Sequence, residues 1–481
     1  MCTKSLKTTA SKKKLYAARP EPASPATVET QRTKTRCRQE PCDPHSLERG
    51  VRQLLADKVS GTLLGTWLLV PEHLRLGTWD LLCGWSGQSS RRVEPRLALQ
   101  LVHEAALCVN GVRLGRSLSQ KGFEAANGLP FVASDQAIHD LLNSHTVAQA
   151  HDLQAALGHI RRASGHFKGN LLAIDPHRMH SYSKRQTVRR KSKSESQAVK
   201  SAQTFFCFDV ETLQPLAFTI GSSARTPTQA TPELLQLTER ILQPRGHSPL
   251  VLADTEHVSI DLFEHVLTKT PFDLMTPLPK RSSTDKQLAQ LEPSSFTPRW
   301  AGFATTSRPF CFKHSRTPFH QVVQRCGERD DDYRFKAFLS TFPGNEVENL
   351  TVQYPKRWHV EEFFNAYQSL GWKRAGTLNL NIRYGRMTFA LLAQASLHTL
   401  RKRLGDPYES WEASHFANRL LAGLDGDLRV SDDTIIVTFY NAPNSEHLQQ
   451  HYKDLPAKLE REGVDPRIPW LYDYKLDFRF K

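Results

Sequence analysis

Five apolar runs of strand length and two helical segments constrain how residues 170–276 can fold. The strand-like runs are 170–175, 204–210, 215–220, 249–254 and 272–276. Helical periodicity fills the gaps between the last three runs, at 231–242 and 259–269. Thr231 and Pro232 are typical of an N-cap followed by the first helical position, so we expect the first helix to begin there. The sequence therefore predicts a β-β-β-α-β-α-β unit and an α/β fold.

The first and fourth apolar runs each end on an acid, Asp175 and Asp254. Strand ends are where open α/β sheets build their sites. The order of elements resembles the ribonuclease H-like fold, in which the first and fourth strands are neighbours, and this implies that the two acids lie side by side. Two unpaired carboxylates in contact resist ionisation, a conflict that divalent cations relieve. Taken singly, an acid that ends a strand is most often a turn or cap residue. His177, Glu256 and His257 flank these acids and are assigned no role.

Residues 354–368 have the pattern of an amphipathic helix that begins at Pro355, a residue suited to the first helical position. Its apolar stripe consists of Val360, Phe363, Phe364 and Tyr367. Glu361 lies beside this stripe with Arg357 one turn before it, whereas Glu362 points away from both. Two interpretations remain open for Glu361: a third acid of a site, or a surface ion pair with Arg357 at i, i+4 spacing.

With three acids at these positions, the chain resembles the DDE transposases of bacterial insertion sequences over roughly residues 130–400. It is most similar to the subgroup with a long β-insertion before the last acid and a Tyr-x2-Arg-x3-Glu-x6-Lys pattern. In this sequence the pattern reads Tyr354, Arg357, Glu361 and Gln368. The catalytic, metal-binding triad that the resemblance implies is Asp175, Asp254 and Glu361. The implied cofactor is a pair of Mg²⁺ ions, with Mn²⁺ as a substitute.

The resemblance also implies contacts to DNA from this helix. Tyr354 and Arg357 would grip a phosphate near the cleaved end, a task that suits the guanidinium fork. Gln368 departs from the lysine of the family pattern. We therefore expect that phosphate contact to be weakened, or supplied by Lys373 or Arg374.

Two further features are candidates for DNA binding. The family uses a tryptophan of its β-insertion to stabilise a flipped base, and Trp300 is the candidate here, with a place in the hydrophobic core as the alternative. A basic run at 184–193 follows Asp175 in the chain. Its central residues are Arg189, Arg190 and Lys191. We expect this run to contact DNA phosphate, although a solvated loop needs no function.

At 481 residues the chain is too long for one ordinary core, so several domains are expected. We predict a disordered basic arm (1–43), a helical DNA-binding domain (44–165), the first part of a ribonuclease H-like mixed-sheet core (166–279), a β-rich insertion (280–345), the rest of the core with the catalytic helix and a helix at 384–404 (346–404), and a C-terminal region (405–481). A plain helical bundle is the alternative for the second segment. The last segment is expected to contain a hairpin at 431–433, a helix at 445–462 and an aromatic tail, either closing the catalytic domain or forming a dimer contact.

The charge balance points to a polyanionic partner. Lys and Arg total 64 against 49 Asp and Glu, a net charge of +15, and nucleic acid is the commonest partner of such a chain. The eight cysteines form no Cys-x-x-Cys pair, so neither a zinc ribbon nor a disulfide framework is predicted. No window of 18 uninterrupted apolar residues occurs, and no membrane partner is expected. These features favour a reducing compartment, and the resemblance implies a cytoplasmic, nucleoid-associated bacterial protein.

The function predicted from these residues and the resemblance is that of a DNA transposase. It would bind the terminal inverted repeats of its element and catalyse Mg²⁺-dependent strand cleavage and strand transfer into target DNA, as a homodimer in the synaptic complex. Three alternatives remain: a structure-selective nuclease on the same fold, a non-enzymatic DNA-binding protein derived from a transposase, and a metabolic or structural α/β protein with incidental acids.

Overall fold

The computed structural model describes residues 43–87, 92–109, 118–190, 197–313, 315–372 and 377–481. All of them belong to one unit, 41–481. The basic arm expected at 1–43 lies outside the described residues except for Asp43, whose side chain caps the first helix.

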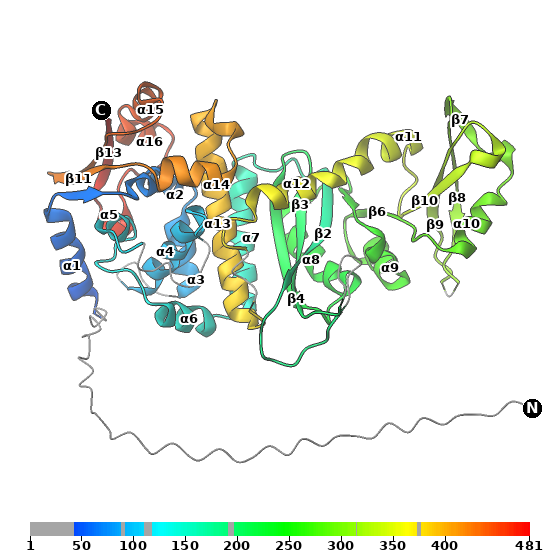
Figure 1. Ribbon diagram of the computed structural model, residues 1–481, viewed down its shortest axis with the longest axis horizontal. Coiled ribbons are helices and arrows are strands. Elements are labelled where there is room, and N and C mark those ends of the chain that lie inside the picture. Colours follow the sequence, from blue (N-terminus) through cyan, green and yellow to red (C-terminus); the bar gives the residue numbers. More distant parts are fainter. Residues whose placement is uncertain (1–42, 88–91, 110–117, 191–196, 314, 373–376) are drawn as a thin grey trace, which may run out of the picture. The chain divides into compact units, whose positions relative to one another are not determined.

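A mixed sheet of nine strands runs through the described residues in the order β4-β3-β2-β5-β6-β10-β9-β8-β7 (Figure 1). Its strands are β2 (Leu171–His180), β3 (Ser201–Asp209), β4 (Gln214–Ser222), β5 (Leu250–Leu252), β6 (Asp273–Pro277), β7 (Thr297–Trp300), β8 (Phe303–Phe310), β9 (Phe319–Cys326) and β10 (Arg334–Ser340). Strand β2 is antiparallel to β3 and parallel to β5, which is parallel to β6. The predicted ribonuclease H-like core is therefore confirmed.

Alternate residues of strand β3 build the two faces of this core. The helices involved are α8 (Pro227–Leu242), α9 (Ile260–Lys269), α12 (His359–Tyr367) and α13 (Leu380–Leu404). Phe205 and Cys207 are buried in one cluster with residues of α8 and α9. Phe206 and Phe208 are buried on the opposite face, where both rings contact Phe364 of α12. The period-two pattern of an apolar strand thus supports two separate layers.

The expected start of α8 at Thr231 and Pro232 is wrong. The helix begins at Pro227, and Thr226 is its N-cap, accepting a hydrogen bond from the backbone N–H of Gln229 in a capping box. Pro232 lies inside the helix, where it removes one backbone donor, and the Thr231 hydroxyl donates to the carbonyl of Pro227. Two threonine-proline pairs occur between residues 226 and 232, and the capping glutamine selects the earlier one.

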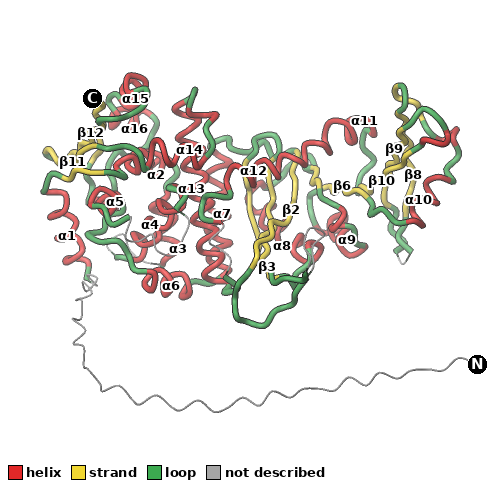
Figure 2. The backbone as a smooth tube through the Cα atoms, viewed as in Figure 1, coloured by secondary structure: helices red, strands yellow, loops and turns green. Residues whose placement is uncertain are grey.

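The β-rich insertion continues the core sheet. Strand β10 pairs antiparallel with β6 of the core on one side and with β9 on the other (Figure 2). The expected return strand at 333–342 is thereby confirmed. Helix α10 (Ser282–Ala289), which the sequence pattern did not indicate, packs Leu288 against Ala304 and Ala337 of the insertion.

The helical run before the third acid begins earlier than expected. It comprises α11 (Glu346–Glu348), a π-helical stretch η6 (Asn349–Gln353), a 3₁₀ stretch η7 (Tyr354–Trp358) and α12. The predicted start at Pro355 is wrong. Pro355 falls inside the 3₁₀ stretch, where the α-helical hydrogen-bond ladder is already interrupted and its missing N–H is tolerated.

The segment before the core is helical, as expected. Its helices are α1 (Pro44–Ala56), α2 (Val70–Arg75), α3 (Thr78–Ser86), α4 (Glu94–Ala106), α5 (Lys121–Ala126), α6 (Asp135–Ser144) and α7 (Val147–Ala163). Ser134 caps α6 and Thr146 caps α7, each through its side chain. A short strand, β1 (Val59–Gly61), interrupts the helices.

A second sheet, in the order β1-β11-β12-β13, joins this segment to the C-terminal region. Its other strands are β11 (Gly426–Ser431), β12 (Thr434–Phe439) and β13 (Lys475–Phe480). The expected hairpin at 431–433 is present between β11 and β12. The segment boundaries themselves, and the DNA-binding role of the helical segment, stay predictions.

Two helices of the C-terminal half differ from expectation. The helix expected at 384–404 is α13, which begins at Leu380 because Asn379 accepts a hydrogen bond from the backbone of Ile382. The helix expected at 445–462 is two helices, α15 (Ser445–Tyr452) and α16 (Leu455–Arg461). Asp454 has a positive φ of 53° between them, which ends one helix before the next begins. A short helix, α14 (Ala413–Phe416), follows α13.

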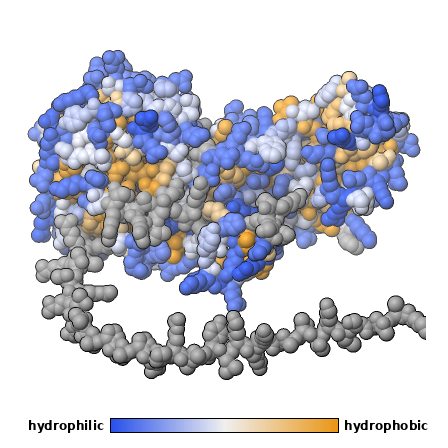
Figure 3. Space-filling view, viewed as in Figure 1, coloured by the Kyte–Doolittle hydropathy of each residue, from blue (hydrophilic) through white to orange (hydrophobic). Residues whose placement is uncertain are grey.

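In the described part of the chain, no helix is long and apolar enough to cross a membrane. Most of the face in view in Figure 3 is hydrophilic, with hydrophobic residues interspersed among the others.

Candidate active site

Asp175 lies within strand β2, and Asp254 lies just beyond the end of strand β5. These strands are parallel, and Ala173 pairs with Leu252. Extending the register by two residues places Asp175 level with Asp254, on strands about 4.8 Å apart. The expectation that Asp175 ends its strand is wrong, because β2 continues to His180 through its pairing with β3. Register, rather than a pair of strand ends, sets the relation between the two acids.

Asp175 points to the face of the sheet that α12 covers. Ile174 is buried in the cluster formed with α8 and α9, whereas Ala173 is buried in the cluster that contains Phe363 of α12. Because side chains alternate along a strand, Asp175 shares the face of Ala173. Its side chain is 18% exposed, and Nη1 of Arg357 donates a hydrogen bond to its Oδ1 at 3.3 Å.

The surroundings of Asp175 disfavour its charged form. Burial raises the pKa of Asp175 to about 7, and the nearby charges of Asp254 and Glu361 act in the same direction. The guanidinium of Arg357 opposes them but does not prevail. Because the charged form of Asp175 is disfavoured, a bound cation would stabilise it.

Asp254 is held in its charged form by the turn that follows it. Its Oδ1 accepts hydrogen bonds from the backbone N–H of Glu256 at 3.0 Å and from Nδ1 of His257 at 2.7 Å, within the 3₁₀ stretch η3 (Thr255–His257). Burial alone raises the pKa of Asp254, but the hydrogen bond and charge of His257, the backbone hydrogen bond from Glu256 and the charge of Arg357 together lower it. The imidazole is buried. Sequence reasoning gave His257 no role, although its position three residues after a capping aspartate was an available signal.

Tyr354 supports the strand that leads to Asp254. Its hydroxyl donates a hydrogen bond to the carbonyl of Ala253 at 3.2 Å, and its ring packs on Phe338 of β10. Burial raises the pKa of Tyr354 to about 12, so the hydroxyl stays protonated. The guanidinium carbon of Arg357 lies 6.0 Å from the centre of the same ring.

Glu361 is exposed on α12, whereas Val360 and Phe363 are buried, as their stripe predicted. Among the described residues Arg357 pairs with Asp175, and no ion pair joins it to Glu361. Within those same residues, no three acidic, histidine or cysteine side chains are close enough to hold a metal ion together. The charge of Glu361 nevertheless reaches Asp175, whose pKa it raises.

The acids and the arginine of this site lie within a match to a known protein family. Residues 166–395 match the family model of the transposase DDE domain. The matched stretch contains the core sheet, the insertion, α12 and most of α13. A solved structure of a piggyBac transposase synaptic complex with hairpin DNA is similar to the chain at 12% sequence identity and a TM-score of 0.35, covering 76% of this chain and 88% of that chain. No curated protein matches the chain.

Within the matched stretch, Trp300 is on the surface and not in the core. Its side chain is 52% exposed at the end of β7, and its ring stacks on Phe303 with centroids 4.3 Å apart. The partner ring holds one face of the indole, which leaves an aromatic surface available to a ligand.

The basic loop between β2 and β3 is exposed at Arg189 and Arg190. Arg190 pairs with Val199 across the loop, and its guanidinium donates to the carbonyl of Ala224. Gln368, the departure from the family pattern, is half-buried at the end of α12. The other predicted DNA contacts, Lys191, Lys373 and Arg374, lie outside the described residues.

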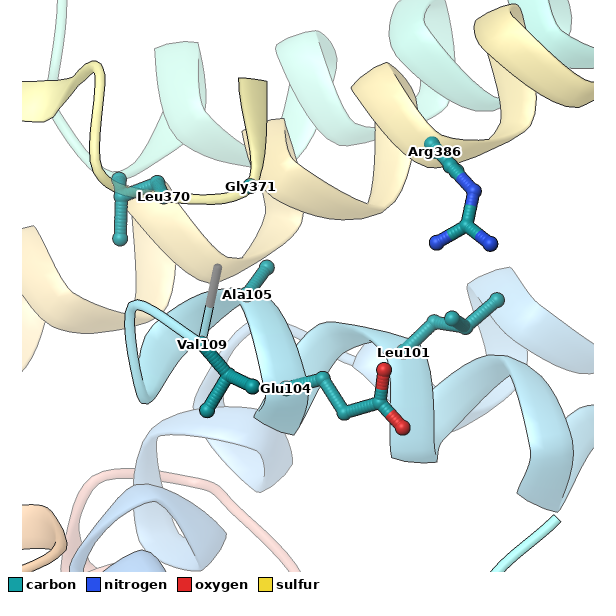
Figure 4. Close-up of a pocket in the computed structure, with 7 residues that line it drawn as sticks. All are labelled: Leu101, Glu104, Ala105, Val109, Leu370, Gly371 and Arg386. Carbon is teal, nitrogen blue, oxygen red and sulfur yellow. The ribbon is translucent and has the colours of Figure 1, made fainter. Parts of the chain in front are cut away.

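A small cavity lies apart from these acids, between α4 and α13 (Figure 4). Its lining includes Leu101, Glu104 and Arg386, and its volume is about 20 Å³. That volume holds roughly one water molecule, so the cavity is too small for a nucleotide.

Proposed function

We propose that this chain is a DNA transposase that cleaves DNA at the ends of its element and joins the freed ends to target DNA. The observation that carries the proposal is the parallel pairing of β2 with β5, whose register, extended by two residues, brings Asp175 level with Asp254, together with the hydrogen bond from Arg357 to Asp175. The transposase DDE domain model spans all of these residues, which supports the same conclusion.

The acids fit a divalent metal site by their chemistry. Asp175 and Asp254 offer hard carboxylate oxygens, which Mg²⁺ prefers, and the burial of Asp175 beside other negative charge makes a cation there favourable. Glu361 would complete the set by a rearrangement of its exposed side chain. Bound Mg²⁺, or Mn²⁺ in its place, would activate the attacking water or hydroxyl group and stabilise the leaving oxygen.

Arg357 would bind and orient the scissile phosphate. Its guanidinium is mostly buried and now donates to Asp175. A phosphate oxygen is the same kind of acceptor as a carboxylate oxygen, so DNA can replace Asp175 as a partner of Arg357 and release Asp175 for metal. Tyr354, whose hydroxyl holds the carbonyl of Ala253, would keep Asp254 in place during this exchange.

Other residues would hold the DNA at a distance from the acids. Arg189, Arg190 and Lys191 of the basic loop would contact phosphates, and Trp300 would stack on an unpaired or flipped base. The phosphate contact expected of the lysine that Gln368 replaces would come from Lys373. Terminal inverted repeats and target DNA are the proposed partners, with two copies of the chain joined in the synaptic complex.

The experiment that tests this function uses purified wild-type protein, Mg²⁺ or Mn²⁺, and linear DNA that carries the inverted repeats flanking the coding sequence. We expect cleavage at the repeat ends by the wild type. We expect no cleavage but retained DNA binding by Asp175→Asn, Asp254→Asn and Glu361→Gln. Near wild-type cleavage by any of these variants would exclude that residue from the catalytic set.

A second arm separates a transposase from a nuclease on the same fold. Pre-cut repeat ends are incubated with a plasmid target, and joined products are scored by gel and by sequencing. A transposase joins the ends to the plasmid. Cleavage of intact substrate without joining would instead identify a structure-selective nuclease.

A further inference from the structure

Two cations of strand β10 lie on one face of the β7–β10 sheet. Ala304 and Ala337 point toward α10 and are buried with Leu288. The residues that alternate with Ala337 along β10 lie on the other face, and two of them, Arg334 and Lys336, are exposed. Helix α10 therefore covers one face and leaves these cations on the opposite one.

The strand register connects this face to Trp300. Successive cross-strand partners from β10 to β7 are Arg334, Cys326, Phe303 and Trp300. Directly paired residues share a face, so Arg334 and Trp300 stand on one line across three strand spacings, about 14 Å. Lys336 is two residues nearer to the core sheet on the same face.

Lys336 also reaches the residues around the acids. Its Nζ lies 4.8 Å from the centre of the Phe338 ring and 5.5 Å from that of Tyr354. The guanidinium carbon of Arg357 lies 6.0 Å from the same tyrosine ring. One tyrosine thus contacts two cations, of which only Arg357 has a carboxylate partner among the described residues.

A third cation adds to this cluster. The backbone N–H of Leu278 donates to the carbonyl of Ala337 at 2.8 Å, which brings the segment containing Lys280 beside Lys336. Burial lowers the pKa of Lys336, and the charges of Arg357 and Lys280 lower it further. Contact with the two aromatic rings explains where the Lys336 side chain lies, because a lysine stem can cover apolar surface. It does not explain why Lys280 and Arg357 lie near the same side chain. A polyanion on this face would relieve their repulsion.

We infer that Lys336 and Arg334 form a phosphate track on this face of the insertion, along which a DNA strand runs between Asp175 and Trp300. The inference rests on the proposed function and deepens it, since it assigns residues that carry DNA from the acids to the tryptophan. The ligand class is the phosphodiester backbone, which cations bind without reading sequence.

The first test is lysine protection. Wild-type protein is acetylated briefly with and without a terminal-repeat duplex of roughly 40 base pairs, and modification of each lysine is measured by mass spectrometry. Lys269 is the internal reference, because it is exposed on α9, on the face of the core sheet opposite Asp175. We expect DNA to protect Lys336 several-fold and to leave Lys269 unchanged. Equal modification of Lys336 with and without bound DNA would overturn the inference.

The second test is the salt dependence of binding by Lys336→Ala, Arg334→Ala and the double variant. Each lost phosphate contact should reduce the slope of log binding constant against log salt by about 0.9, so the double variant should lose about 1.8. Lys269→Ala removes the same charge and should leave the slope unchanged, and Lys336→Arg should restore it. Both track residues are exposed, so equal melting temperatures will exclude unfolding as the cause.

The outcomes separate this inference from the proposed function. If the wild type cleaves repeat ends and the double variant keeps the full salt slope, the phosphate track is wrong but the proposed transposase function is unaffected. If the wild type neither binds nor cleaves DNA, the proposed function itself is wrong.

Discussion

Arg357 donates a hydrogen bond to Asp175 across a separation of 182 residues in the chain, at 3.3 Å. The pair joins the 3₁₀ stretch η7, just before α12, to the middle of β2. It also brings a group suited to phosphate next to an acid suited to metal. The proposed binding of DNA by Arg357 and of metal by Asp175 would each break this hydrogen bond, so each would favour the other.

Replacing Arg357 by Gln should impair cleavage more than binding. The guanidinium would act at the scissile phosphate, and loss of one such donor costs about 10²-fold or more in rate. Arg357→Lys should give an intermediate rate, because it keeps the charge without the fork. The measurement is single-turnover cleavage of terminal-repeat DNA. Arg178→Gln removes the same charge from β2, where Arg178 pairs with exposed Glu256, and equal losses in the two variants would contradict the assignment.

In the absence of divalent metal, replacing Asp175 and replacing Asp254 should change the free energy of unfolding in opposite directions. The pKa of Asp175 is raised to about 7 from an ordinary 3.8, so folding favours its protonated form and wild-type stability falls as pH rises between these values. Asp175→Asn should therefore stabilise the metal-free protein at pH 8, by on the order of 1–4 kcal/mol, and have little effect near pH 4.

Asp254→Asn is the matched control in the same urea-unfolding measurement. The pKa of Asp254 is lowered, so its charge stabilises the fold above its unfolded pKa, and that contribution is lost as pH falls. This variant should be less stable than wild type at pH 8. Two variants that shift stability in the same direction would contradict the electrostatic description of the pair.

His257 should govern metal affinity by orienting Asp254. Loss of a group that orients a metal-binding residue typically weakens metal binding by roughly 10–100-fold. We expect His257→Ala to raise the half-saturating Mn²⁺ concentration for cleavage by such a factor. His257→Asn should restore part of it, since its amide can donate where Nδ1 does. If His257→Ala needs the same Mn²⁺ concentration as the wild type, His257 contributes only to packing.

Trp300 should matter for DNA and not for folding. Base stacking on an aromatic side chain is worth about 1–3 kcal/mol per base, so Trp300→Ala should weaken binding to ends with an unpaired base by about 5–150-fold. Trp300→Phe should retain much of the affinity. Because the side chain is half exposed, the free energy of unfolding should change by only about 0.5 kcal/mol. The checks are a fluorescent base analogue at the DNA end and urea unfolding.

The sequence predicted the core because its signals are local. Fully buried strands require continuous apolar runs, and the runs from 170 to 276 appear as strands close to their expected limits. The caps at Ser134 and Thr146 are local in the same sense, since each side chain bonds a backbone N–H within the next turn. The extension of β2 to His180 was missed because its outer residues are polar and gain strand structure only by pairing with β3.

The contacts within the site could not be predicted from local periodicity, because they join segments far apart in the chain. A uniform turn of 100° per residue places Arg357 on one stripe with Glu361. The structure has a 3₁₀ stretch at Tyr354–Trp358, which turns more tightly, and Arg357 is bound to Asp175 instead. The pairing of β10 with β6, which brings Phe338 to Tyr354, joins distant segments and leaves no trace in either sequence alone.

The pairing of β1 with β11 has a consequence for how the chain acquires its structure during synthesis. Val59 pairs with Leu428, so the edge strand of the C-terminal sheet is made long before its partner exists. Contacts of such high sequence separation form slowly, after local ones. Strand β1 therefore stays unpaired until β11 has left the ribosome. Only nearly full-length chains can close this sheet, and truncated products lack the partner strand.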